Sequence, residues 1–159
     1  MEETQRDAEL WRRLSTGEHP GQVTGSTHPK PITEPEENLA IEIWTETELA
    51  CLHAMWWHAR RHPELRPVVE SAVAWHLANL QPDNGTNHAW AVHVFVDAAW
   101  PEDGELDPEA DLHAQGLVHA SMYLTGKPDA LSALLIADAG RGVEMLLNEP
   151  PARAGGPRT

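Results

Sequence analysis

Apolar side chains recur every three or four residues along most of the chain between residues 46 and 148. This period places them along one face of an α-helix. Proline and glycine interrupt the pattern at intervals, and both residues end helices readily. The pattern therefore predicts an all-α protein with five helices, at 46–62, 67–80, 88–100, 108–125 and about 129–148.

The first two predicted helices form a hairpin. Thr45 and Glu48 have the Ser/Thr-x-x-Glu spacing of a capping box, which predicts a helix start near Glu46. Pro63 ends this helix, and Pro67 fits the first turn of the next one. Because only a few residues separate the two helices, they should pack as an antiparallel hairpin.

The third predicted helix, 88–100, is apolar on nearly every side. Its Val-Phe-Val run would also suit a buried strand, but no second strand pattern is present to pair with it. Helix is therefore the better prediction, with Asn87 as its N-cap. Asp107 and Asp129 are the expected caps of the fourth and fifth helices.

The fourth predicted helix carries two apolar stripes. One consists of His113, Leu117, Ala120 and Leu124, and the other of Leu112, Gly116, His119 and Tyr123. A helix with two such faces packs between neighbours. In a small domain some of this apolar surface is left over, which predicts a protein partner or a homo-oligomer.

Outside the helices, the pattern divides the chain into three parts. Residues 1–38 mix charge, glycine and proline, and only Leu10, Trp11 and Leu14 suggest a short amphipathic turn. We expect this segment to be a flexible arm or a strap lying across the domain. Residues 39–149 should form the helical domain, and residues 150–159 a disordered tail.

Composition narrows the functional classes. The formal net charge of −14 argues against nucleic acid and against an anionic membrane surface, because both favour clusters of Lys and Arg. The single cysteine excludes an internal disulfide and cysteine-rich metal sites. No apolar run reaches the length of a membrane span, and the acidic N-terminus lacks the apolar core of a secretory signal. We therefore expect a soluble, cytoplasmic protein.

The loop between the second and third helices is the first candidate site. Its turn residues and the Asn87 cap explain the loop without any ligand. Its side chains would nevertheless suit a polar, carbohydrate-like ligand, with hydrogen bonds to hydroxyls and an indole beneath a ring. The candidate binding residues here are Asp83, Asn84, His88, Trp90 and His93.

The second candidate set is a carboxylate with histidines. Asp138 falls inside the apolar stripe of the fifth helix, where a carboxylate is costly unless it is hydrogen-bonded or paired. His76 and His113 also lie on apolar stripes. We hypothesise that Asp138 meets one of these two histidines, either as an architectural pair or to fix its tautomer at a working site.

Metal-binding motifs are not found in the sequence. There is no His-Glu-x-x-His sequence, and the Glu-x-x-His pairs of a di-iron bundle are absent. The alternating acidic residues at 103–111 lack the Gly and Glu positions of a calcium loop, which Pro108 and Ala114 occupy. We therefore expect no metal and no cofactor.

Two stretches, HLANLQPDNGTNHAW at 76–90 and DLHAQGLVHASMYLTGKPDALSALLIADAGRGVEML at 111–146, resemble the helical hairpins of α/α-toroid proteins, such as six-hairpin glycosidases and polysaccharide lyases. The resemblance covers residues 45–148, and it also extends to short bacterial proteins of this helical type. It implies an α/α solenoid whose loops, including 82–90, line a ligand-binding end. Those barrels use many more helices than this chain offers, so no catalytic residue is carried over.

Two functional hypotheses follow from these residues. In the first, the protein is a non-enzymatic helical module that binds a protein partner or a small polar ligand, with the 82–93 loop as its recognition surface. In the second, it is a small hydrolase-type enzyme in which Asp138 or Asp83 acts with a histidine as general base or as a metal-binding set.

Overall fold

The computed structural model describes residues 2–21, 28–35, 40–81, 86–100, 105–123 and 126–148, with side chains from residue 8 onward. Within these ranges the protein is all-α, as predicted, and no strand occurs. Its elements are α1 (Glu2–Thr16), α2 (Ile41–Ala59), the 3-10 helix η1 (Pro63–Leu65), α3 (Arg66–Asn79), α4 (Val92–Ala99), α5 (Pro108–Ala120) and α6 (Ala130–Asn148). The predicted tail, 150–159, lies outside the described residues.

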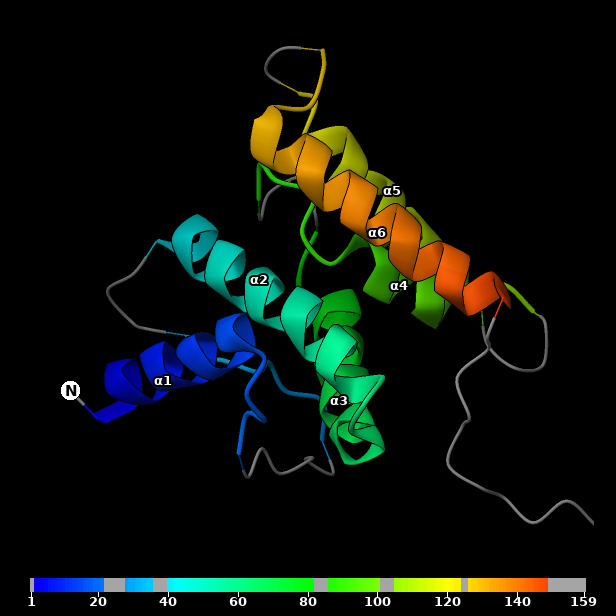
Figure 1. The fold of residues 1–159 in the computed structure, drawn as a ribbon. Helices are drawn as coiled ribbons and strands as arrows, with labels where there is room; N and C mark the ends of the chain where they lie inside the picture. Colours follow the sequence, from blue (N-terminus) through cyan, green and yellow to red (C-terminus); the bar gives the residue numbers. More distant parts are fainter. Residues whose placement is uncertain are drawn as a thin grey trace, which may run out of the picture.

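The short helix α4 packs against four other helices. It packs against α5 and α6 on one side and against α2 and α3 on the other. Helix α2 crosses the middle of the molecule, with α1 along it and with α3 joined to it through η1 (Figure 1). The core therefore lies around α2 and α4, whose fully enclosed side chains include Leu49, Leu52, Met55, Val94 and Phe95. No helix of the described part has both the length and the hydropathy needed to cross a membrane.

Helix α2 begins five residues before its predicted start, at Ile41. The Thr45 hydroxyl donates to the Ile41 carbonyl oxygen at 2.7 Å, so this threonine lies inside the helix. Glu48, the other half of the expected capping box, is fully buried and binds residues 32 and 33. The capping-box prediction is wrong because the helix begins before Thr45, and because Glu48 binds residues that lie far from it in the sequence.

Helix α4 begins later than predicted, at Val92. Ala91 precedes it in the left-handed conformation, with φ 55° and ψ 17°. A non-glycine residue there is strained and interrupts a right-handed helix. Residues 86–90 therefore form an irregular turn, and Asn87 is not the N-cap.

The predicted caps of the last two helices are confirmed. Asp107 accepts hydrogen bonds from the backbone N–H groups of Glu109 and Ala110, at 2.9 and 3.3 Å. Asp129 accepts from the N–H of Ser132 at 2.9 Å. Each carboxylate satisfies donors that the first turn of a helix leaves without partners.

The N-terminal region contains a full helix where only one turn was expected. Helix α1 lies along α2, and Leu14 is buried between them. The His58 ring hydrogen-bonds the Leu14 carbonyl oxygen at 3.2 Å. Packing of this kind stabilises a helix whose own sequence gives only a weak signal.

Residues 28–35 run as a strap across α2 and α3. The N–H of Lys30 donates to Ser71 Oγ on α3 at 3.1 Å. The N–H groups of Ile32 and Thr33 donate to the carboxylate of Glu48 on α2, each at 2.7 Å. The strap is thus hydrogen-bonded to both α2 and α3, mainly through its backbone N–H groups.

Candidate functional site

The Asp138 carboxylate joins α6 to α2. Its Oδ2 atom accepts hydrogen bonds from His53 Nε2 and from Trp57 Nε1, both at 2.9 Å. Its Oδ1 atom accepts from Arg141 Nη2 at 2.8 Å. The sequence predicts a free-energy cost for a carboxylate on the apolar stripe of α6. Three hydrogen-bond donors offset this cost, and two of them lie on α2.

The histidine that meets Asp138 is His53, so the expectation of His76 or His113 is wrong. His53 lies at the edge of the apolar stripe of α2, where it faces α6. Its Nδ1 atom accepts the N–H of Ala91 at 3.2 Å, so Nε2 carries the proton that is donated to Asp138. Both ring nitrogens are engaged, which leaves neither one to accept a proton from a substrate.

Burial and hydrogen bonding set the charges of this pair. Burial lowers the pKa of His53 more than the Asp138 carboxylate raises it. Burial alone would raise the pKa of Asp138, but hydrogen bonds from His53 and Trp57 leave it below its ordinary value. At neutral pH a charged Asp138 therefore holds a neutral His53.

His93 lies next to this pair but is enclosed by rings. It is 0% exposed, and its ring centroid is 4.5 Å from that of His53 and 4.6 Å from that of Trp56. Neither ring nitrogen has a hydrogen-bond partner among the described residues. Burial lowers the pKa of His93 to about 3. A Cβ at Gly142 would lie 3.0 Å from His93 Cβ, so glycine is needed for this close packing.

His76 and His113 form a separate group around Phe95. The His113 ring lies 4.2 Å from Phe95, and the two histidine rings are 6.3 Å apart. His76 Nε2 is 3.6 Å from the buried Glu48 carboxylate. Burial lowers the pKa of His113 to about 4. Four buried histidines are thus divided between two groups, of which only the pair His53 and His93 lies beside Asp138, while buried His58 binds the Leu14 carbonyl oxygen instead.

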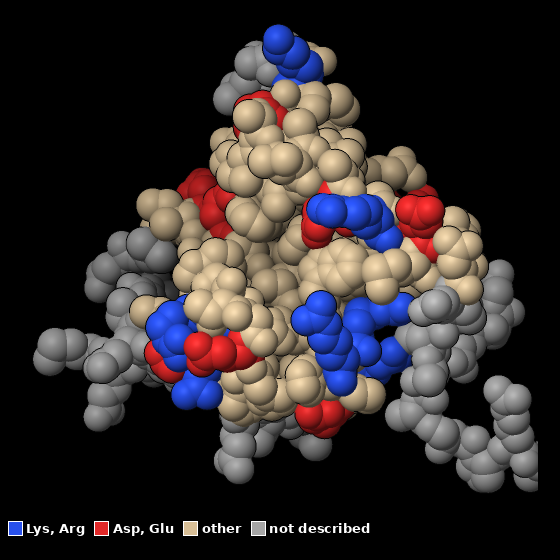
Figure 2. All heavy atoms as spheres, viewed as in Figure 1, with Lys and Arg blue, Asp and Glu red and all other residues tan. Residues whose placement is uncertain are grey.

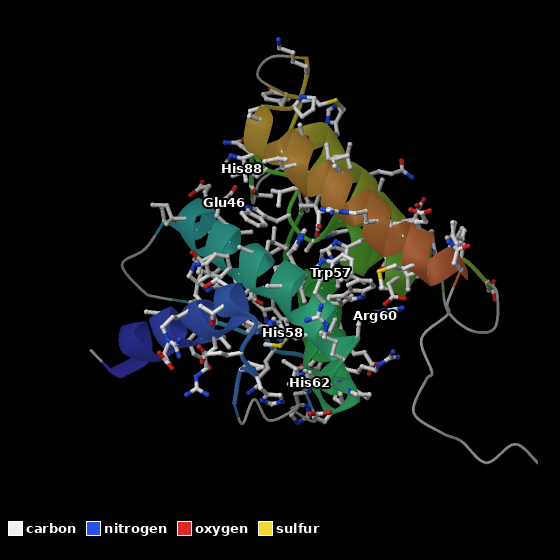
Figure 3. All side chains as sticks on the ribbon, in the orientation of Figure 1. Glu46, Trp57, His58, Arg60, His62 and His88 are labelled. Carbon is white, nitrogen blue, oxygen red and sulfur yellow. The ribbon has the colours of Figure 1, made fainter. Side chains whose placement is uncertain are left out.

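The 86–90 turn closes onto Glu46 of α2. The Glu46 carboxylate accepts hydrogen bonds from the Thr86 hydroxyl, from His88 Nδ1 at 3.0 Å and from Trp90 Nε1 at 2.8 Å. Figure 3 shows Glu46 and His88 facing each other at one end of α2. His88 and Trp90 of the predicted ligand loop are therefore bonded to Glu46, and Asp83 and Asn84 lie outside the described residues.

One pocket of about 50 Å³ lies beside α2 and α3. Asp97 in its wall accepts a hydrogen bond from Trp56 Nε1 at 2.8 Å. Two arginines and two carboxylates line the pocket, so their charges balance and favour neither an anion nor a cation. Its lining residues are Trp56, Ala59, Arg60, Arg66, Val69, Glu70 and Asp97.

Comparison of the chain with protein-family models, with curated proteins and with solved structures gave no match. The resemblance to α/α-toroid hairpins stays a prediction.

Replacement of Asp138 by alanine is expected to lower the free energy of unfolding by about 2–4 kcal/mol, because the donors of buried His53 and half-buried Trp57 lose their acceptor. Asp138→Asn should cost less, since it keeps one acceptor oxygen. Urea denaturation measures both. Arg141→Ala is the control: its side chain is 71% exposed, and its loss should cost under about 1 kcal/mol. Equal losses for Asp138→Ala and Arg141→Ala would contradict an architectural Asp138.

Proposed function

We propose that this protein is a non-catalytic helical interaction module that pairs with a second copy of itself through the exposed edge of α6 that borders α2. The supporting observation is a row of side chains that we call the α6 stripe, at Leu131, Leu134, Asp138, Arg141 and Met145, in which Asp138 is 28% exposed and is also bonded to α2. Leu131 is 42% exposed and Leu134 is 69% exposed. The spacing alternates between three and four residues, which is the repeat that lets two helices pack along a common seam.

Charge favours this face over others. The whole chain has a formal net charge of −14, so most surfaces of two copies repel each other. In the α6 stripe the two charged residues, Asp138 and Arg141, neutralise each other through a contact of 2.8 Å. Figure 2 shows an uncharged surface over the upper part of α6, with basic and acidic side chains next to each other over its middle. A second copy therefore meets little net charge along this stripe.

The non-catalytic part of the proposal is supported by the internal hydrogen bonds of Asp138, His88 and Trp90. A hydrolase based on Asp138 would require His53 to release the Ala91 N–H before it could accept a proton. A polar ligand at the 82–93 loop would have to compete with Glu46 for His88 and Trp90. We further propose a cytoplasmic location, in keeping with a single cysteine.

Leu134→Glu is expected to weaken self-association by about tenfold or more, because it places a charge in an apolar contact. Sedimentation velocity over a concentration series measures this. Wild-type association should strengthen from about 0.05 M to about 0.5 M NaCl, because salt screens repulsion between acidic chains.

The matched control is Leu112→Glu on α5, where the leucine has the same exposure of 69%. It should leave the association constant unchanged. A wild-type protein that stays monomeric over the whole series, or equal effects of the two variants, would overturn the proposal. Both leucines are exposed, so both variants should keep the unfolding midpoint of the wild type.

A further inference from the structure

Three side chains with metal-binding atoms converge where α2 passes into η1, away from the sites described above. They are His19, which follows α1, His62, which follows α2, and Glu64 within η1. Glu64 Oε1 lies 3.3 Å from His19 Nε2 and 3.6 Å from His62 Nδ1. One ligand atom from each residue lies within 4.8 Å of the other two. Figure 3 shows His62 at this end of α2.

The backbone holds the three residues in place. The N–H of His62 donates to the His58 carbonyl oxygen at 2.9 Å, and the His62 carbonyl oxygen accepts from Leu65 N–H at 2.9 Å. This turn fixes His62 relative to Glu64. His19 arrives from the other direction, because Leu14 anchors the end of α1 against α2. Segments more than forty residues apart in sequence therefore supply the cluster.

We propose that His19, His62 and Glu64 form a binding site for a divalent transition metal of the zinc class. Two imidazoles and a carboxylate are ordinary zinc ligands, and they suit zinc better than calcium or magnesium, which prefer oxygen alone. Metal–ligand bonds of about 2.0–2.2 Å in a tetrahedral site separate the ligand atoms by about 3.3–3.5 Å.

The separations in the structure are close to this requirement. The two distances to Glu64 Oε1, 3.3 and 3.6 Å, already match a tetrahedral edge. The remaining separation, between the ligand nitrogens of His19 and His62, is within 4.8 Å. Both side chains are partly exposed and so have room to rotate: the His19 side chain is 40% exposed and that of His62 is 39% exposed. Three protein ligands leave the fourth position to water.

Loading the site removes two hydrogen bonds of His19. His19 Nδ1 accepts the N–H of Gly21 at 3.1 Å, so the ring proton is on Nε2 and points to Glu64. Zinc bound at Nε2 would take the place of that proton, which would move to Nδ1, so that the hydrogen bonds of His19 with Glu64 and with Gly21 would both be lost. The bound metal would fasten the segment after α1 to the junction of α2 and η1, and would thereby stabilise the docking of α1.

The test is titration of the full chain with Zn²⁺ alone, by calorimetry and by competition with a chromogenic chelator. The wild-type protein should bind one zinc ion tightly. His19→Ala and His62→Ala should each weaken that binding by about tenfold or more. Zinc should also raise the wild-type unfolding midpoint and leave that of the double variant unchanged.

The chain has ten histidines, so weak binding elsewhere needs a control. His119→Ala on α5 removes an exposed histidine outside the cluster and should keep the wild-type affinity. The proposal is overturned if the wild-type protein binds no zinc tighter than about 0.1 mM. It is overturned equally if the His19→Ala/His62→Ala double variant binds zinc as the wild-type protein does. The cluster is at the surface, so these variants should fold.

Discussion

Acidification from about pH 6.5 to about pH 4.5 is expected to lower the free energy of unfolding by about 4 kcal/mol. The cause is two buried histidines, His93 and His113, which are 0% and 5% exposed. Burial lowers their pKa values to about 3 and about 4. In an unfolded chain both would titrate near about 6.5.

The sign of the effect follows from proton uptake. Between the folded and the unfolded pKa values, the unfolded chain binds protons that the folded protein does not, so stability falls as the pH falls. Each histidine contributes up to about 1.4 kcal/mol per pH unit in this window. The contribution is complete above about pH 6.5, and for His113 the loss ends near about pH 4. A typical domain is stable by about 5–15 kcal/mol, so this loss is a large fraction of the total.

Urea denaturation at a series of pH values measures this slope. His113→Phe should remove about half of it, because phenylalanine has no proton to gain and the site already packs against Phe95. His119→Gln, at an exposed position on α5, should keep the full slope. A wild-type slope near zero, or one that His113→Phe leaves unchanged, would contradict buried neutral histidines.

The Glu48→Ala substitution is expected to lower the free energy of unfolding by about 3–5 kcal/mol and to release the strap from α2. Glu48 is 0% exposed. Its carboxylate accepts the N–H groups of Ile32 and Thr33 and the Thr33 hydroxyl, each at 2.7 Å. Without it these donors stay buried without an acceptor. Glu48→Gln keeps one acceptor oxygen and should fall between the wild type and alanine.

Two measurements separate strap release from general loss of stability. Denaturation gives the change in free energy, and hydrogen exchange gives the protection of the Ile32 and Thr33 amides. The control is Glu42→Ala, an exposed glutamate in the first turn of the same helix, which should cost under about 1 kcal/mol. The strap assignment is wrong if amide protection survives in Glu48→Ala, or if the two alanine variants lose equal stability.

The helices themselves could be predicted well where an apolar stripe ends at proline. Helices α3 and α6 have nearly the bounds that the sequence predicts. The starts of α2 and α4 could not be predicted, because distant partners decide them. Glu48 has the position of a capping residue, but Ile32 and Thr33 of the strap bind it. Alanine is a residue type that favours helices, but Ala91 follows the turn that Glu46 holds and has a positive φ.

The candidate site could be predicted only in part. The apolar stripe around Asp138 indicated that this carboxylate needs partners, which is confirmed. The identity of the partner depends on how α2 is rotated toward α6, and periodicity does not fix that angle. Glu48 had the same signal as Asp138, because Leu52, Met55 and Ala59 continue its face at helical spacing. No such pattern marks Glu46 in the sequence, because the side chains of residues 86–90 that donate to it come near it only through the path of the loop.

The strap has a consequence for how this sequence can change over time. Its contacts with Glu48 and Ser71 come mostly from backbone N–H groups, which every residue except proline provides. The side chains at positions 30 and 32 can therefore be substituted by many others while the backbone hydrogen bonds persist. The residue that cannot change is Glu48, because no other residue type places two charged acceptor oxygens at the same distance from the backbone. A segment that looks variable in sequence can thus be fixed in space by a residue on another element.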